Sequence, residues 1–383
     1  RCRLNTNKDS CISAVFFTTS VTFDAYLRPI LIATNDGNTS VYINKTYNVA
    51  NQVLFESFES TSSTEMNGNT YQYDGLGRLL SVTVTGGGTT HYSYLFGNKV
   101  LNLGVFNLDG NVVWILDDIN IFGKVDSISQ IGFYGSIPIT QTEYRAYDAQ
   151  QRLCQIERKD VGTTIIKYNA LDEVIWMAQG QTASNHDSCN ETAISSKKVT
   201  YTYDNLGAQR TTSYGDSTPK KTYTYDNNGN VKTIVTSEYS QAYNYNSRNL
   251  LDDETLVIDG NSFLLDYAYN DLGYLSSIKY PNDTSAINFS TNGFGQATQA
   301  IKGQTEFIKG GADKATYYAN GLINSFTYGN GILHKTHLNS RKIPSCILDY
   351  KGSMPTCGTG SSVVNLDYSF DNNLNVIAIV NPR

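Results

Sequence analysis

The sequence predicts an all-β fold built from tandem β-hairpins. The 383 residues include 28 Tyr and 31 Gly but only 7 Pro, and charged residues make up only 17%. Tyr and Thr favour strands, whereas Asn, Asp and Gly favour turns. Apolar residues do not recur at the helical spacing i, i+3, i+4, i+7. A short motif that contains a turn repeats along the chain, which indicates that one hairpin unit is used many times.

The motif reads Y-x-Y-[D/N]-x-x-G-x-[L/V]. Its clearest copies are "YQYDGLGRL" from Tyr71, "YTYDNLGAQ" from Tyr201, "YTYDNNGNV" from Tyr223 and "YAYNDLGYL" from Tyr267. Weaker copies are "RAYDAQQRL" from Arg145, "KYNALDEVI" from Lys167, "YNYNSRNLL" from Tyr243 and "YSFDNNLNV" from Tyr368. The segments "TNGFGQA" from Thr291 and "YYANGLINS" from Tyr317 keep the turn but lose part of the aromatic pair.

The copy at residues 223–231 shows how the unit works. Tyr223 and Tyr225 alternate with Thr224, so both rings project from one face of a strand. Asp226 is placed to accept backbone N–H groups in the following turn, and Gly229 tolerates a positive φ. A lone hairpin is marginal in water, but successive hairpins stabilise one another by burying each other's faces.

We therefore interpret the motif residues as architecture and expect no catalytic, cofactor-binding or metal-binding residue. The residues to which this structural role is assigned are Tyr71, Tyr73, Asp74, Gly77, Tyr147, Asp148, Tyr201, Tyr203, Asp204, Gly207, Tyr223, Tyr225, Asp226, Gly229, Tyr243, Tyr245, Asn246, Tyr267, Tyr269, Asn270 and Gly273.

The motif also suggests how the chain is organised. Residues 1–65 are β-like but lack a recognisable copy, so we predict a β-rich segment without the repeat, followed by a repeat region over residues 66–383. Further hairpins are expected where Asp-Gly separates apolar runs, at residues 32–43, 105–116 and 255–267. Polar insertions near residues 181–196 and 351–362 are expected to be surface loops.

Six cysteines fall into three pairs that are local in sequence: Cys2 with Cys11, Cys154 with Cys189, and Cys346 with Cys357. Six cysteines allow 15 connectivities, so this pairing is a hypothesis, and six buried thiols are the alternative. Disulfides would place the protein in an oxidising, exported location, so we expect it to be secreted or on a cell surface. The sequence begins at Arg1 without Met, from which we expect a processed product or a piece of a longer protein.

The tandem motif resembles the YD repeat of the Rhs family, which includes bacterial polymorphic toxins, the C component of insecticidal toxin complexes and the teneurins. The stretch "YYANGLINSFTYGNGILHKTHLNSRKIP", residues 317–344, resembles the same family, so the resemblance covers roughly residues 65–383. It implies a sheet that spirals into a hollow shell or part of one, which in toxin members encloses a C-terminal toxin. No Asp-Pro-x-Gly occurs in the chain, so no residue inherits the family's aspartyl self-cleavage role.

The sequence suggests three candidate functions. The first is a non-enzymatic shell, or a fragment of one, that carries an effector polypeptide. The second is an extracellular adhesion protein or self-assembling surface fibre, whose partners would be neighbouring subunits paired through sheet edges. The third is a secreted polysaccharide hydrolase with paired carboxylates, which the use of the repeated Asp residues in turns disfavours.

Other chemistry has little support in the sequence. The net charge of −6 and the absence of a basic cluster argue against nucleic-acid binding, and no apolar run reaches the length of a membrane helix. His334 and His337 are interpreted as surface residues, and the sequence indicates no partner for His91 or His186. The clusters Asp117-Asp118 and Asp252-Asp253-Glu254 are interpreted as turn carboxylates, because neither has calcium-loop spacing.

Overall fold

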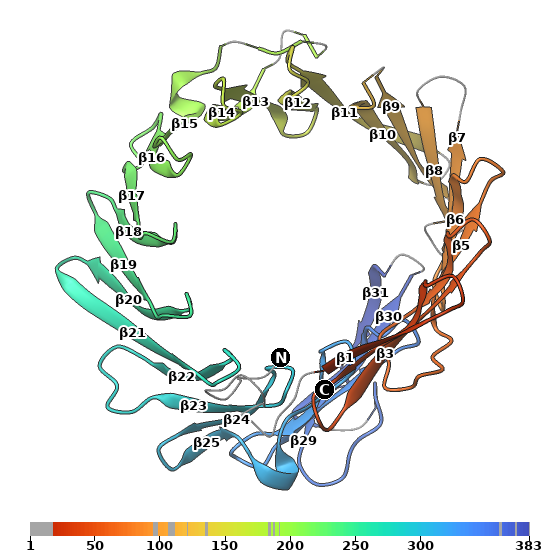
Figure 1. The fold of residues 1–383 in the computed structure, drawn as a ribbon, viewed down its shortest axis with the longest axis vertical. Coiled ribbons are helices and arrows are strands. Elements are labelled where there is room, and N and C mark those ends of the chain that lie inside the picture. The colour runs from red at the N-terminus through yellow and green to blue at the C-terminus, as the bar shows by residue number, and fades with distance from the viewer. Residues whose placement is uncertain are drawn as a thin grey trace. The chain divides into compact units, whose positions relative to one another are not determined.

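The computed structural model confirms the all-β class. It describes residues 18–94, 99–105, 112–120, 122–134, 137–182, 185–186, 188–190, 192–359, 362–371 and 374–382. Within these ranges the chain forms antiparallel strands and two short 3-10 helices, η1 (Ser195–Lys197) and η2 (Gly311–Asp313), and no α-helix. Figure 1 shows the strands following one another in chain order. No helix in this described part has the length and apolarity that crossing a bilayer requires.

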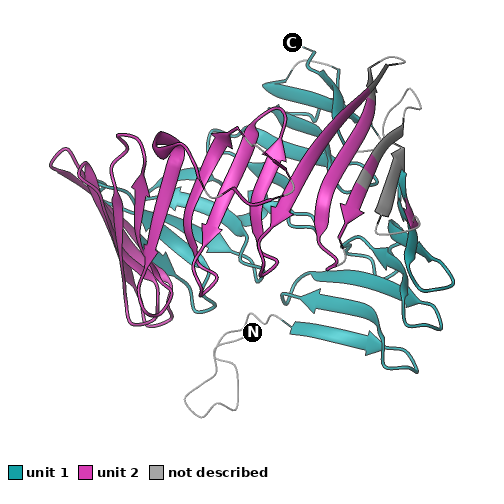
Figure 2. Cartoon of the chain, turned by 90° about the horizontal axis from the view of Figure 1, so that it is seen from above, with its two compact units in different colours: residues 1–91, 104–111, 267–383 teal, residues 92–103, 112–266 magenta. Residues whose placement is uncertain are grey.

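The chain divides into two compact units, shown in Figure 2. Unit 1 comprises residues 1–91, 104–111 and 267–383, and unit 2 comprises residues 92–103 and 112–266. The strands β7 (Thr89–Tyr94), β8 (Lys99–Val105) and β21 (Asn261–Tyr269) cross these boundaries along the chain.

Unit 2 is an antiparallel meander in which each strand pairs with the next one in sequence. Its strands are β9 (Val112–Ile119), β10 (Val125–Tyr134), β11 (Ile137–Tyr147), β12 (Leu153–Arg158), β13 (Gly162–Tyr168), β14 (Val174–Gln181), β15 (Lys198–Tyr203), β16 (Gln209–Tyr214), β17 (Lys221–Tyr225), β18 (Val231–Val235), β19 (Tyr239–Tyr245) and β20 (Leu251–Ile258).

Unit 1 contains strands from both ends of the sequence. The early strands are β1 (Thr18–Phe23), β2 (Pro29–Asn35), β3 (Ser40–Tyr47), β4 (Val53–Ser57), β5 (Gly68–Tyr73) and β6 (Leu79–Val84). The late strands are β22 (Leu275–Lys279), β23 (Ile287–Thr291), β24 (Ala297–Lys302), β25 (Thr305–Ile308), β26 (Thr316–Tyr317), β27 (Ile323–Thr327), β28 (Leu333–Leu338), β29 (Pro344–Tyr350), β30 (Val364–Phe370) and β31 (Val376–Val380). The strands of this unit pair in order from β1 to β6, from β22 to β25 and, in a separate sheet, from β26 to β31.

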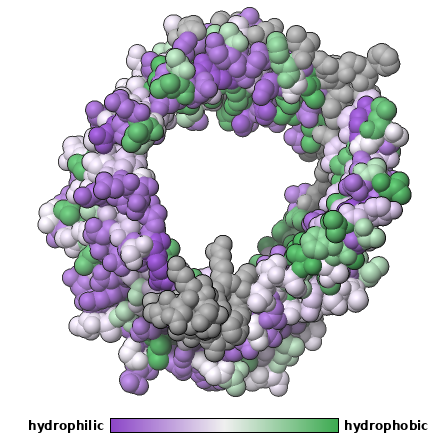
Figure 3. All heavy atoms as spheres, viewed as in Figure 1, coloured by the Kyte–Doolittle hydropathy of each residue, from purple (hydrophilic) through white to green (hydrophobic). Residues whose placement is uncertain are grey.

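Among the described residues, neither unit has a thick hydrophobic core. In unit 2, Ile165, Trp176 and Ala178 form a small buried cluster, and in unit 1 Leu348 is fully buried. Most other strand residues are half-buried, and Figure 3 shows hydrophilic and hydrophobic residues interspersed over the visible face. Stability must therefore rest largely on cross-strand contacts of half-buried side chains and on hydrogen bonds between neighbouring hairpins.

The turn geometry of the repeat also occurs before residue 66. The turns at Asp24–Arg28 and Asn48–Gln52 have the same backbone hydrogen bonds as the turn at Asp74–Arg78. These two copies were missed because Leu27 and Asn51 replace the motif glycine, yet they adopt the same left-handed conformation with φ of 60° and 64°. Neighbouring structure holds them there, although this region disfavours most L-residues.

Candidate functional site

The candidate site is the repeated unit itself, and its centre is an Asx turn. In the copy at Asp226, the carboxylate Oδ1 accepts the N–H groups of Asn228 at 2.8 Å and Asn230 at 2.9 Å. The Asp226 N–H donates to the Asn230 carbonyl, and the Gly229 N–H donates to the Asp226 carbonyl. The Asn230 side-chain hydrogen bond, followed by these backbone N–H bonds, lowers the pKa of Asp226 against the opposing effect of burial.

The same backbone pattern recurs along both units. Turns of this kind begin at Asp24, Asn48, Asp74, Asn120, Asp148, Asn169, Asp204, Asp226, Asn246, Asn270, Asn292, Tyr318, Tyr328, Asn339 and Asp371. At Tyr318 and Tyr328 the first position is not Asx, and there the third residue, Asn320 or Asn330, accepts the backbone N–H instead. The positive φ is carried by Gly in most copies, but by Gln151, Asp172, Asn249, Lys342 or Leu374 in others.

In eight copies the second tyrosine of the motif joins its hairpin to the one before it. The Tyr245 hydroxyl donates to the carbonyl of Val231, the first residue after the preceding turn, at 3.0 Å. Equivalent hydroxyl-to-carbonyl bonds join Tyr47 to Pro29, Tyr73 to Val53, Tyr147 to Val125, Tyr168 to Leu153, Tyr203 to Val174, Tyr225 to Gln209 and Tyr317 to Ala297. Burial raises the pKa of Tyr73, Tyr203, Tyr225 and Tyr245.

The first tyrosine of each motif has different surroundings from the second. Tyr71, Tyr201, Tyr223 and Tyr243 lie two residues earlier on their strands and are half-buried. Between the two tyrosines, the intervening residue faces the other side, where Thr224 bonds Thr233 and Thr202 bonds Thr211 across the hairpin. The register shifts at the second tyrosine, between Thr224 and Tyr225 for example, so each hairpin carries a β-bulge that bends and twists it.

The turns are also linked directly to each other. The Arg152 guanidinium pairs with Asp148 in its own turn and reaches the Asn169 carbonyl and Asp172 in the next turn, at 2.8 and 2.7 Å. It also lies over the Tyr168 ring, 4.7 Å from the centroid. Arg28, Gln52 and Asn230 occupy the equivalent position and likewise bond the following turn. In these four copies a side chain just before the return strand therefore ties one repeat to its successor.

Two of the three proposed disulfides are present. The structure joins Cys154 to Cys189 and Cys346 to Cys357, with Cα–Cα separations of 5.5 and 6.0 Å. The proposed partners Cys2 and Cys11 lie outside the described residues.

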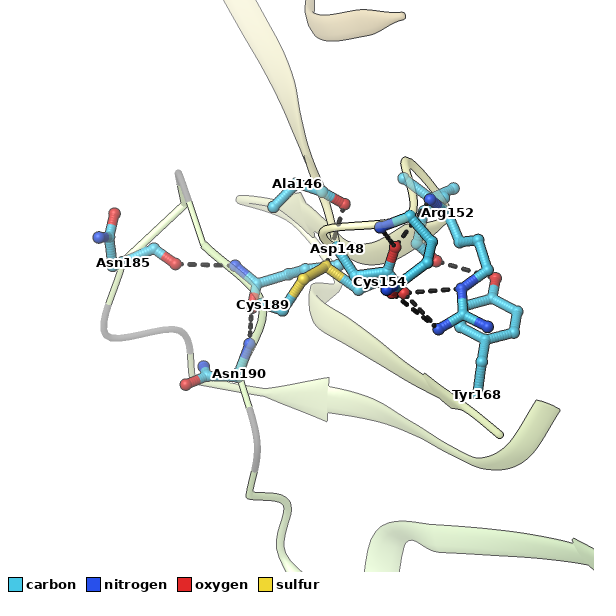
Figure 4. The surroundings of a disulfide bond; sticks show 11 residues. Ala146, Asp148, Arg152, Cys154, Tyr168, Asn185, Cys189 and Asn190 are labelled. Carbon is cyan, nitrogen blue, oxygen red and sulfur yellow. Dashed lines mark hydrogen bonds and ion pairs between the residues drawn. A yellow bond between two sulfur atoms is a disulfide. The ribbon is translucent and has the colours of Figure 1, made fainter. Parts of the chain in front are cut away.

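The Cys154–Cys189 bridge fixes the polar insertion of unit 2 against the sheet (Figure 4). Gln155, only 1% exposed, donates to the Asn185 carbonyl at 2.8 Å and accepts the Asn190 N–H at 3.3 Å. The His186 ring stacks on Tyr144, with centroids 4.3 Å apart. The insertion is therefore a docked segment rather than only a covalently tethered loop.

Several residues interpreted as turn or surface groups lie elsewhere. Asp117 and Asp118 are on β9, and Asp252, Asp253 and Glu254 are on β20, so they are strand residues rather than turn carboxylates. His334 is not a surface residue: its Nδ1 lies 2.7 Å from Asp349 Oδ1, its Nε2 lies 3.1 Å from Thr336 Oγ1, and its ring stacks on Phe326. These contacts span β27, β28 and β29, so only strand pairing reveals them.

No cluster of three His, Cys, Asp or Glu side chains suited to a metal ion occurs among the described residues. The buried carboxylates and hydroxyls of the repeat are used in hydrogen bonds within and between hairpins. What the arrangement can do is hold successive hairpins in a fixed register.

Tyr245→Phe is expected to destabilise unit 2 by about 1 kcal/mol, because the Val231 carbonyl loses its hydrogen-bond donor. Tyr243→Phe, at the first tyrosine of the same strand, is the matched control and should change stability by less than about 0.5 kcal/mol. Urea denaturation of both variants checks this. Equal losses in the two variants would show that the hydroxyl bond between repeats does not contribute to stability.

Comparison with known proteins identifies the fold. No protein family model and no curated protein matches the chain. Among solved structures, TcdB2-TccC3-TEV matches with a TM-score of 0.67 and 12% identity, over 95% of this chain and 22% of that chain. The Tc holotoxin pore of Photorhabdus luminescens, which carries a TccC3 mutation, matches with a TM-score of 0.69 and 12% identity, over 96% of this chain and 22% of that one. The chain therefore shares the fold of part of these proteins and spans about a fifth of their length.

Proposed function

We propose that the chain is a non-enzymatic YD-repeat shell protein of the Rhs family, or part of one, that encloses or carries a C-terminal effector polypeptide. The observation that carries this proposal is the repeated tyrosine hydroxyl bond, which joins one hairpin to the previous one in many copies. Such a unit builds a continuous wall by repetition. The likeness of fold to Tc toxin chains supports the same reading, since the sequence resemblance already includes toxin complexes.

The expected partners and location follow from this role. The partners are a polypeptide cargo or neighbouring repeat subunits, and no cofactor is required. The two disulfides support a secreted or cell-surface location, because such bonds persist in oxidising compartments.

The shell proposal is tested on the protein encoded by the whole gene. Sequencing beyond the codon for Arg383 should reveal an unrelated effector-like segment in the same polypeptide. In the intact protein this segment should resist trypsin, whereas the same segment produced alone should be digested. A reading frame that ends at Arg383, or a downstream segment that is equally sensitive in both forms, contradicts the proposal.

A second function, self-assembly into a surface fibre, is favoured by one observation. Strand β31 pairs with β30 on one side, and its Val376, Ile377, Ile379 and Val380 side chains are 46 to 56% exposed. An apolar edge strand of this kind is suited to pairing with another chain. Electron microscopy separates the two functions, since the fibre predicts long filaments and the shell predicts closed, uniform particles.

A further inference from the structure

Unit 1 contains an open groove with a volume of about 430 Å³. Its lining comes from the β2–β3 turn, the β23–β24 turn and the segment that leads into β26, and includes Asp36, Asn38, Phe294, Gln296, Tyr317 and Tyr318. An adjoining hollow of about 270 Å³ shares Glu59, Tyr317, Tyr318 and Ala319 with it. The combined depression, here called the unit 1 groove, falls within the size range of small-molecule sites.

The polar wall of the groove is preorganised. Asp36 is 2% exposed, and its Oδ1 accepts the N–H groups of Asn38 and Thr39 at 3.0 and 2.7 Å. Gly293 lies so close to Asp36 that a Cβ atom there would come within 2.5 Å of the Asp36 Cβ. The two turns are therefore packed against each other before any ligand arrives, which reduces the entropy lost on binding.

Amide groups at this wall are available to a ligand. The Gln296 Oε1 accepts the Asn292 side chain at 2.7 Å, which orients the Gln296 amide and leaves its NH₂ group free to donate. The Asn38 side chain is exposed in the β2–β3 turn. Together they offer both donors and acceptors without charge.

Aromatic residues also line the groove, namely Phe294, Tyr317 and Tyr318. The Tyr317 hydroxyl donates to the Ala297 carbonyl, and the Tyr318 hydroxyl donates to the Thr336 carbonyl at 2.7 Å, so both tyrosine rings are held in place. Rings held in this way offer flat apolar faces to a ligand.

The charges in the groove argue against an ionic ligand. Glu59 and Lys314 have opposite signs and are exposed, and the described residues give neither an ion-pair partner. A phosphate or carboxylate ligand needs clustered cations, and here one lysine faces two carboxylates. An added peptide strand is also disfavoured beside β26, because the Ala315 N–H already donates to the Thr298 carbonyl.

We propose that unit 1 binds a neutral oligosaccharide in this groove. Sugar rings present C–H faces that pack on aromatic rings, and hydroxyl groups that exchange hydrogen bonds with amides and carboxylates. The groove supplies both kinds of surface side by side. This inference goes beyond the shell role and does not depend on it.

Saturation-transfer NMR and calorimetry with maltotetraose, cellotetraose and tetra-N-acetylchitotetraose test the proposal on the purified chain. At least one of these should bind, and its affinity should change less than twofold between low and high salt, because no ion pair is formed. Ala319→Trp should fill the groove and weaken binding at least tenfold. Ala149→Trp is the matched control, since Ala149 occupies the same second turn position in unit 2, and binding should stay within twofold.

Asn38→Ala provides a second variant if Ala319→Trp fails to fold, and it should weaken binding severalfold without a change in thermal stability. The proposal is overturned if none of the saccharides binds. It is also overturned if both groove variants bind the saccharide as tightly as the wild type, or if these variants instead lose binding of an extended peptide.

Discussion

Replacing both Cys154 and Cys189 with alanine is expected to lower the free energy of unfolding of unit 2 by about 3–4 kcal/mol, because the bridge closes a loop over a sequence separation of 35. The insertion should also become more accessible, since it would then be held only by noncovalent contacts such as those of Gln155 and His186. Urea denaturation measures the first effect, and hydrogen exchange of residues 185–190 measures the second.

Cys346→Ala with Cys357→Ala is the matched control, because this bridge is in unit 1 and closes a separation of only 11. It should leave exchange at residues 185–190 unchanged. In this variant, reduction of the Cys154–Cys189 disulfide with dithiothreitol should lower the stability of unit 2 as much as replacing Cys154 and Cys189 does. If exchange and stability of unit 2 do not change in either experiment, the docking role assigned to the bridge is wrong.

Glu65→Gln is expected to destabilise unit 1 at neutral pH but not in strong acid. The Glu65 side chain is 11% exposed, and Lys342 Nζ lies 3.1 Å from its Oε2. Desolvation raises its pKa, but hydrogen bonds from the Asn67 backbone, Ser60 and Lys342 outweigh this and lower the pKa to about 2. The difference from the ordinary glutamate pKa of 4.5 sets an upper limit of about 3 kcal/mol for the stabilisation.

The direction of the pH dependence follows from linkage. A carboxyl whose pKa is lowered on folding stabilises the folded state fully above its unfolded value and loses this stabilisation as the pH falls. The difference in stability between wild type and Glu65→Gln should therefore be largest above pH 4.5 and should disappear towards pH 2. Thermal unfolding across this range measures it, with Glu238→Gln, at an exposed turn position, as the control. A difference in stability that does not change with pH would show that the charge of the Glu65 carboxylate does not stabilise the fold.

The repeat could be predicted from the sequence because its requirements are local. Asp226 and Gly229 form their turn from groups only a few residues apart, so residue type alone reports the backbone conformation. The pairing of Cys154 with Cys189 could also be predicted, since the two are successive cysteines in the sequence and one of them lies in a polar insertion. The copies at Asp24 and Asn48 could not be predicted, because Leu27 and Asn51 occupy the position at which the motif has glycine.

The sequence by itself determined the all-β class, the strand–turn–strand unit and its tyrosine-rich face, since side-chain alternation and turn chemistry act over neighbouring residues. Only the tertiary structure decided what each tyrosine hydroxyl bonds, which turn Arg152 reaches, and where His334 and Glu65 find partners. It also decided that the turn at Asp36 and the segment at Tyr317 line one groove. The partners in these contacts are separated in sequence by as little as one repeat or by as much as most of the chain. The local preferences of one partner therefore do not specify the other.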